Sequence, residues 1–313
     1  MAKIRSNESV EKQIQRAVNE AANKKQAEKN ALKNRPKTDR KVEYKEKKLA
    51  DDTRDVLRFI PLGGLGEIGK NLTVYEYNDD IIVVDAGFAF PDNDQLGIDY
   101  TIPEVTYLEE NKHKIRALLI THAHEDHVGG IPYIWPKLGV PIYGSQWSCG
   151  FIEKKLEEFE LPSKPEFRMV DLDKNEKIQL GAFTVEFFRV NHAVPDPAGV
   201  AITTPVGTVI HTGDFKFDHT PVDGKKTDFS RLSEYGAEGV LALMSDSTNC
   251  EVPGYTMSEK DIEGHMSRIF EKSGGRLIIS SFASQINRIQ QVINLCEKYN
   301  RKLAFSGRSI LKN

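Results

Sequence analysis

Runs of apolar residues divide most of the chain after residue 55 into short strands and helices. Runs of about four to eight apolar or β-branched residues between turn residues are typical of half-buried or buried strands. Elsewhere the apolar positions recur every three or four residues, which predicts amphipathic helices. We expect strands at residues 56–60, 72–77, 81–84, 117–120, 140–143, 183–190, 208–211, 277–282 and 302–305, and helices at 104–114, 131–138, 146–159, 258–272 and 286–299. Because strands and helices alternate, the pattern predicts an α/β fold rather than an all-β sandwich.

The first 54 residues have a different pattern, with few large apolar side chains. They carry 16 Lys and Arg against 9 Asp and Glu, a net charge of about +7, whereas the rest of the chain carries about −10. Ala, Lys, Glu, Asn and Gln dominate the segment, and Arg35-Pro36 interrupts any helix. Residues 1–54 are therefore predicted to be a disordered or transiently helical extension. Two roles stay open for it, a solvated tail and a basic arm that gathers RNA or a partner.

The overall composition narrows the class of protein. At 313 residues, 39% of them hydrophobic, the chain is long enough for two domains. Its cysteines, Cys149, Cys250 and Cys296, form no CxxC pair, which argues against a disulfide framework and suits a reducing compartment. No apolar run approaches the ~20 residues of a membrane span, and the N-terminus lacks the apolar core of a secretory signal. We therefore expect a cytoplasmic protein without a membrane partner.

One stretch concentrates side chains that bind metals. The apolar run at 117–120 predicts a buried strand, and the motif HxHxDH follows it with His122, His124, Asp126 and His127. The two alternating histidines would point to one side of an extended backbone. The Asp-His pair follows at a spacing that suits a second metal about 3.5–4 Å from the first. A solvated loop has no reason to concentrate these residues, so the stretch predicts a metal site.

Three other predicted strands end at a histidine or a carboxylate, namely His192, Asp214 and Asp85. Any one of these residues alone would more often be structural, but the HxHxDH motif in the same chain favours a shared site. One metal would be held by His122, His124 and His192, the other by Asp126 and His127, with Asp214 bridging them. Asp85 is either a turn residue or a brace for one of the histidine ligands.

The order of these motifs resembles that of the metallo-β-lactamase superfamily. The stretches LGGLGEIGKN at residues 62–71 and HTGDFKFD at 211–218 are similar to ribonuclease J, of the β-CASP branch of nucleases. MSDSTN at 244–249 resembles the motif that opens the β-CASP domain, where an acidic residue, here Asp246, ends a strand. The glycines of residues 62–71 also partly match the dinucleotide-binding GxGxxG, but a strand rather than a helix follows them. The resemblance covers residues 56–313.

The resemblance implies an αββα metallo-β-lactamase sandwich with a dinuclear zinc site between its two sheets. A partial, truncated β-CASP α/β domain would follow, so the expected divisions are an extension at 1–54 and domains at 55–240 and 241–313. Chains of the family continue beyond this length and carry later histidine motifs, one of which completes the ligands of the second zinc. The sequence is therefore expected to be either a fragment or a chain with an open second metal site.

The resemblance also implies a zinc-dependent ribonuclease, acting as a 5′-to-3′ exonuclease and an endonuclease in rRNA processing and mRNA decay. Two Zn²⁺ ions per subunit would lower the pKa of bound water toward ~7 and supply a bridging hydroxide. Mn²⁺ is an alternative that the spacing leaves open. The residues expected to act in catalysis are Asp126, Asp214 and His192. The donor of the leaving-group proton and the role of Glu125 stay open.

The expected partners are RNA, with a 5′-monophosphate, and further copies of the chain in a homo-oligomer formed through regions absent from this sequence. Candidate substrate contacts are Asp246, Ser280, Ser284, Gly307 and Arg308. Turns with Gly, Ser and Arg after strands suit phosphate binding, although simple turn chemistry explains them as well. Two alternatives stay open. One is another hydrolase on the same fold, such as a thioester hydrolase or a DNA-directed β-CASP nuclease; the other is a non-catalytic RNA-binding subunit of a ribonuclease J complex.

Overall fold

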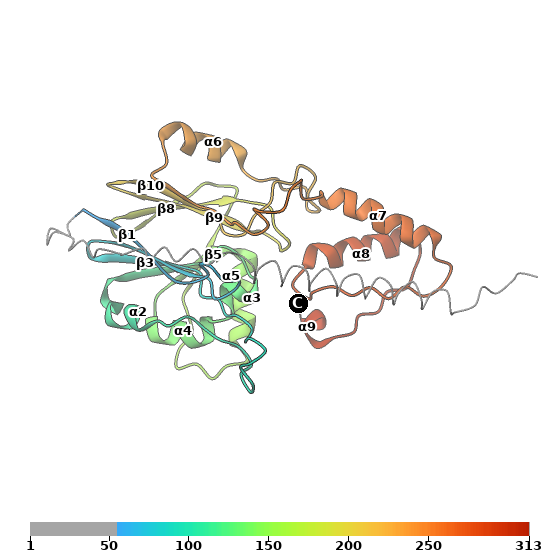
Figure 1. Cartoon of the computed structure of the whole chain (residues 1–313), viewed down its shortest axis with the longest axis horizontal. Helices are drawn as coiled ribbons and strands as arrows, with labels where there is room; N and C mark the ends of the chain where they lie inside the picture. Colours follow the sequence, from blue (N-terminus) through green and yellow to red (C-terminus); the bar gives the residue numbers. More distant parts are fainter. Residues whose placement is uncertain (1–54, 313) are drawn as a thin grey trace, which may run out of the picture. The chain divides into compact units, whose positions relative to one another are not determined.

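The structure, a computed structural model, describes residues 55–312 (Figure 1). The predicted extension at residues 1–54 lies outside the described residues. None of the helices in the described part is both long enough and apolar enough to span a bilayer.

The first of two sheets has six strands in the order β1-β2-β3-β4-β5-β6. The pairs β1–β2 and β2–β3 are antiparallel, and the pairs from β3 to β6 are parallel. The strands are β1 (Leu57–Gly63), β2 (Leu72–Tyr77), β3 (Asp80–Val84), β4 (Ile115–Leu119), β5 (Ile142–Ser145) and β6 (Phe167–Val170). Because β3, β4 and β5 are parallel, the residues that follow them meet at one edge of the sheet.

The second sheet has five strands in the order β11-β10-β9-β8-β7. Its pairs are antiparallel except β10–β11, which is parallel. The strands are β7 (Lys177–Leu180), β8 (Phe183–Arg189), β9 (Ala198–Thr204), β10 (Gly207–His211) and β11 (Ala242–Met244). Since β8 and β10 are both antiparallel to β9, they run in the same direction and end at the same edge.

Helices cover the outer faces of both sheets (Figure 1). Helices α2, α4 and α5 pack on the first sheet, and α6 packs on the second. The helices are α2 (Thr106–Glu110), α3 (Glu125–Val128), α4 (Ile131–Leu138), α5 (Gln146–Leu156), α6 (Phe229–Glu238), α7 (Glu259–Lys272), α8 (Ile286–Lys298) and α9 (Arg308–Lys312), with a 3₁₀ turn η1 (Lys112–Lys114).

Successive side chains of a strand point to opposite faces of its sheet, so neighbouring residues pack in different layers. On β4, Leu118 packs among residues of the helices over the first sheet, whereas Leu119 packs between the two sheets with Phe187 of β8. The next residue of β8, Phe188, packs against Tyr235 of α6. Both leucines are fully buried, and truncating either to Ala would cost about 2–5 kcal/mol. The αββα layering predicted for the chain is thereby confirmed.

The predicted helices at residues 258–272 and 286–299 are confirmed as α7 and α8. Ser258 is the N-cap of α7, and its side chain accepts a hydrogen bond from the backbone N–H of Asp261 at 3.2 Å. Phe270 and Leu295 pack together in a small core shared by the two helices. The apolar stripes of both helices therefore cover each other.

Two predicted strands in this part of the chain are wrong. Neither residues 277–282 nor residues 302–305 form a strand, and Ile278 is 92% exposed. Strand backbones need a neighbour for their N–H and C=O groups, and neither segment pairs with a strand among residues 55–312. An apolar, β-branched sequence was therefore insufficient evidence for a strand. The domain limits at 55–240 and 241–313 stay predictions.

Candidate metal centre

The predicted metal ligands lie where strands of both sheets end. Parallel β3 and β4 are followed by Asp85 and His122 at one edge of the first sheet. In the second sheet, β8 and β10 run in the same direction and lead to His192 and Asp214. Strand direction therefore brings together side chains that are far apart in the sequence.

Four donors form the first group, and they come from three separate parts of the chain. His124 Nδ1 lies 3.1 Å from Nε2 of His122 and 3.1 Å from Nε2 of His192. Asp214 Oδ2 lies 3.7 Å from His192 Nε2 and 4.0 Å from His122 Nε2. Tetrahedral ligands about 2.0–2.1 Å from a zinc ion are about 3.3–3.4 Å from one another. The donor set therefore fits one divalent cation.

A second group consists of Asp126, His127 and the same Asp214. His127 Nε2 lies 3.3 Å from Asp214 Oδ1 and 3.5 Å from Asp126 Oδ2. Asp214 thus presents Oδ1 to this group and Oδ2 to the first. A carboxylate shared in this way suits a bridge between two cations.

Asp85 lies behind the second group and is 2% exposed. Its Oδ2 lies 2.7 Å from His127 Nδ1. Thr121 fixes the carboxylate, because its backbone N–H donates to Oδ1 at 2.9 Å and its hydroxyl to Oδ2 at 2.8 Å. A proton on Nδ1, donated to Asp85, leaves the Nε2 lone pair of His127 facing the donor group.

Burial and neighbouring charges set the protonation of the donors. Burial lowers the pKa of His122 well below its ordinary 6.5 and that of His192 to about 4. Burial acts in the same direction on His127, but the charges of Asp85 and Asp214 outweigh it and raise its pKa well above 6.5. Burial would raise the pKa of Asp214, yet the hydrogen bond and charge of His127 hold it at about 2. The first group is therefore ready to bind a cation at neutral pH, whereas His127 must first lose a proton.

The glycine-rich stretch at residues 62–71 ends at Asn71, which fixes the backbone at Asp126. Asn71 donates to the carbonyl oxygen of Asp126 twice, from its backbone N–H at 3.0 Å and from Nδ2 at 3.1 Å. Gly87 passes so close that a Cβ there would lie 1.6 Å from the same oxygen. The role of Asn71 was not predicted from the sequence, although its place at the end of the glycine-rich motif was a usable signal.

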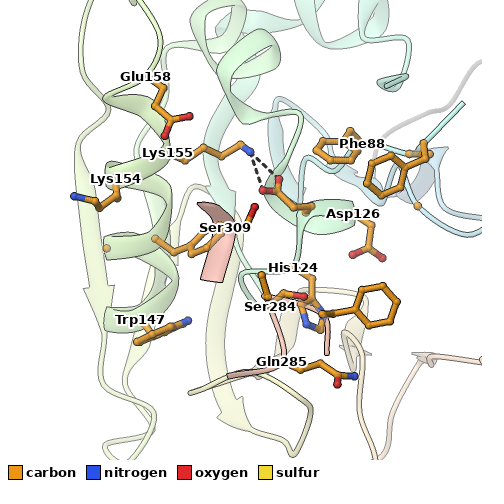
Figure 2. A pocket seen from close by; sticks show the side chains of 18 of the residues that line it. Phe88, His124, Asp126, Trp147, Lys154, Lys155, Glu158, Ser284, Gln285 and Ser309 are labelled. Carbon is orange, nitrogen blue, oxygen red and sulfur yellow. Dashed lines mark hydrogen bonds and ion pairs between the residues drawn. The ribbon is translucent and has the colours of Figure 1, made fainter. Parts of the chain in front are cut away.

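A cavity of about 1090 Å³ lies beside the donors (Figure 2). Trp147, Lys154 and Lys155 of α5 line one side of it, together with Phe88. Lys155 Nζ lies 3.0 and 2.7 Å from the two carboxylate oxygens of Glu125. Glu125, whose role the sequence left open, is therefore held by α5 and not by the donor groups.

The predicted substrate contacts are distributed differently from the metal ligands. Ser284 lines the cavity. Three other predicted substrate contacts do not line it, namely Ser280, Gly307 and Arg308. Asp246 accepts a hydrogen bond at 3.4 Å from the backbone N–H that follows Asp214, so it supports the ligand turn. The substrate roles of all these residues stay predictions.

The chain matches two family models. The model described as Metallo-beta-lactamase superfamily matches residues 65–247. The model described as Ribonuclease J, beta-CASP domain matches residues 274–313.

Curated relatives and a solved structure extend these matches. Ribonuclease J of Thermus thermophilus is 48% identical over 83% of this chain and 46% of its own length. Ribonuclease J of Synechocystis sp. is 45% identical over 82% of this chain and 40% of its own length. The chain therefore spans less than half the length of these relatives. A protein of unknown function from Enterococcus faecalis V583 is similar in fold, with a TM-score of 0.59 and 20% identity over 80% of this chain and 71% of its own.

Proposed function

Because the chain belongs to the metallo-β-lactamase superfamily, we propose that it is the metal-binding part of a ribonuclease of the ribonuclease J type. The observation that carries the proposal is a pair of donor groups that share Asp214 beside a large cavity. The similarity to ribonuclease J relatives supports RNA as the substrate. Since the chain spans less than half of those relatives, hydrolysis by this chain alone is part of the proposal.

Two divalent cations per subunit fit the donors, with Zn²⁺ as the first choice and Mn²⁺ as the alternative. Imidazole and carboxylate ligands suit zinc, and the carboxylates also suit manganese. The first cation would be held by His122, His124, His192 and Asp214, and the second by Asp126, His127 and Asp214. When bound, the pair supplies a nucleophile derived from water at neutral pH and offsets the charge that develops on the phosphodiester.

The protein's own groups keep donors of the first cation in their ligating forms. The low pKa of His192 leaves its imidazole neutral at pH 7, and the low pKa of Asp214 leaves its carboxylate ionised. Asp85 fixes the ring of His127 through Nδ1. Lys155 holds Glu125 by an ion pair, so this carboxylate does not compete for a cation. We propose that Asp126, Asp214 and His192 act in catalysis as ligands that hold the two cations.

The cavity beside the donors suits a single strand of RNA (Figure 2). Phe88 and Trp147 offer aromatic faces for bases, and Lys154 offers positive charge for phosphates. Ser284 adds a hydroxyl for a 5′-monophosphate. From the similarity to ribonuclease J we also propose exonuclease and endonuclease activity, a homo-oligomer and a cytoplasmic location.

The test combines metal content with cleavage. Elemental analysis of the purified chain should give two zinc ions, and the chain should cleave 5′-monophosphorylated RNA but not DNA or a thioester. His124→Ala should abolish cleavage and leave RNA binding largely intact, because it removes a cation ligand and no phosphate contact. His113→Ala changes an exposed histidine outside the site and serves as the control.

A folded protein without bound metal would overturn the proposal, as would full turnover by His124→Ala at saturating metal. Cleavage of DNA or a thioester in place of RNA would identify another hydrolase of the same fold. Two bound metals and tight RNA binding without cleavage would favour a non-catalytic RNA-binding subunit.

A further inference from the structure

A cluster of charged side chains, two buried carboxylates and two half-buried basic groups, joins helices α7 and α8 to the segment that carries Asp214. Glu259, the first residue of α7, accepts hydrogen bonds from Lys216 Nζ at 2.5 Å and from Arg288 Nη2 at 3.2 Å. Its backbone N–H donates to Asp218 Oδ2 at 2.9 Å, and Lys216 Nζ lies 3.4 Å from the same oxygen. Two positive and two negative charges therefore balance in a site where the Glu259 side chain is 11% exposed and that of Asp218 is 1% exposed.

Such a cluster fixes geometry more than it adds stability. Removing one member leaves a buried charge without its partner, which is strongly unfavourable, so all members keep their positions. Gln291 of α8 is fully buried and donates to the carbonyl oxygen of Glu259 at 2.9 Å. The start of α8 is thereby held against α7 and against the segment that follows Asp214.

This arrangement brings α8 to a metal ligand of the first group. Asn287, next to Arg288, donates from Nδ2 to the carbonyl oxygen of His192 at 3.2 Å. At the neighbouring residue, the backbone N–H of Lys216 donates to the carbonyl oxygen of Asn191 at 2.8 Å. The backbone at His192 is therefore held from α8 and from the Asp214 segment at the same time.

The four donors of the first group consequently have two kinds of support. His122 and His124 follow β4 and depend on the first sheet. His192 and Asp214 follow strands of the second sheet, and both are reached from α7 and α8 through Asn287 and Lys216. A metal site tolerates displacements of only about 0.5 Å in its ligands, so support of this kind affects affinity.

We propose that Asn287 is a positioning residue, through which α8 sets the place of His192 and hence the cation affinity of the first donor group. The cluster of Glu259, Lys216 and Arg288 holds α8 in the position where Asn287 reaches the His192 carbonyl. The inference rests on the metal site of the proposed function and is independent of the RNA substrate.

The test uses Co²⁺, whose visible absorption reports on ligand geometry, in the full chain. Asn287→Leu keeps the branching of the side chain at Cγ and removes the donor. We expect it to weaken Co²⁺ binding at the first group by about 10–100-fold and to change its visible bands, as loss of an outer support of a metal ligand does. Asn294→Leu makes the same substitution at an exposed position of the same helix and should change neither.

A second pair of variants examines the cluster. Glu259→Gln removes the charge that Lys216 and Arg288 share and should weaken Co²⁺ binding in the same direction, whereas Glu271→Gln, at an exposed position of α7, should not. Thermal unfolding without metal shows whether each variant is folded.

The outcomes separate the inference from the proposed function. Asn287→Leu with wild-type Co²⁺ affinity and bands would overturn the inference and leave the metal site intact. A wild-type chain that binds no Co²⁺ would overturn both. If Asn287→Leu fails to fold, Asn287→Asp gives the same decision, because a carboxylate also lacks the donor. Its negative charge alone would strengthen cation binding, so weaker binding would support the inference and unchanged or stronger binding would oppose it.

Discussion

At the scale of single residues, the site relies on carboxylates whose two oxygens have different partners. Asp214 gives one oxygen to each donor group. Asp85 is almost fully buried, yet it receives two hydrogen bonds from Thr121 and lies against His127. An ionised carboxylate is stable at such a site only with these partners. Without a cation, a proton on His127 supplies the positive charge that Asp85 and Asp214 face.

Replacing Asp85 tests whether this support acts on the metal. Asp85→Asn keeps the shape but removes the charge next to His127, so we expect cation affinity to fall by about 10–100-fold while the site persists. The measurement is a Zn²⁺ competition titration. Asp80→Asn is the control, because Asp80 binds Arg116 and the Ala182 backbone away from the donors. Equal Zn²⁺ affinity in the wild type and in Asp85→Asn would show that Asp85 is only a turn residue.

The protonation of the donors predicts different pH dependence for the two cations. The pKa of His192 is about 4 and that of His122 is well below 6.5, so the first cation should bind with little proton release at neutral pH. His127 has a raised pKa and is protonated at neutral pH, so the second cation must displace a proton. Its affinity should therefore fall about tenfold for each unit by which the pH is lowered.

Stepwise metal titration in weakly buffered solution, with the released protons counted, distinguishes the two steps. His127→Ala should abolish the second step together with its proton. Equal proton release in both steps would contradict the assignment of the donors to two groups.

At the scale of elements, one face of α5 packs in the core and another lines the cavity. Ser145 caps the helix by accepting from the backbone N–H of Ser148, and Ile152 is buried against the first sheet. Trp147 and Lys155 face the cavity, where Lys155 also reaches Glu125 at the start of α3. The helix therefore links the turn that carries Asp126 to the wall where RNA is proposed to bind.

A lysine on the cavity side of α5 should contribute to RNA binding through phosphate. Lys154→Ala should reduce the slope of log affinity against log salt by about 0.7, the value for one phosphate on a single strand. The measurement is RNA affinity from low to physiological salt. Lys137→Ala removes a partly exposed lysine of α4 that does not line the cavity, and it should leave the slope unchanged. Equal effects of the two substitutions would place the RNA elsewhere.

The elements also show which parts of the fold the sequence could predict. Apolar runs and alternation located β1 to β5, β8 and β10, whose side chains face a core, but missed β6, β7, β9 and β11. The segment at 277–282 has the same composition but no pairing strand among the described residues, and composition contains no information about pairing. The HxHxDH motif is local and could be recognised, whereas the contacts of Asn71 and Asn287 depend on how distant segments pack.

At the scale of the whole molecule, the charge of the chain does not by itself attract RNA. Residues 55–313 carry a net charge of about −10, so phosphate binding there depends on local positive groups such as Lys154 of α5. Residues 1–54, which lie outside the described residues, carry about +7. Their 9 acidic residues are interspersed with 16 basic ones, which dilutes the local positive field. The sequence therefore favours a solvated tail over an RNA-gathering arm.

Deletion of residues 1–54 tests this choice. The truncated protein should keep its fold and its zinc content, because the deleted segment has too little apolar sequence to contribute to a core. For a solvated tail, plots of log RNA affinity against log salt should be parallel for the full and truncated chains. An arm that used all of its excess charge would make the slope of the truncated chain shallower by up to about 5, at about 0.7 per phosphate. Lys154→Ala, measured in both chains, calibrates the effect of one phosphate contact. A clearly shallower slope after the deletion would contradict the tail, and loss of zinc or folding would show that the segment packs on the rest of the chain.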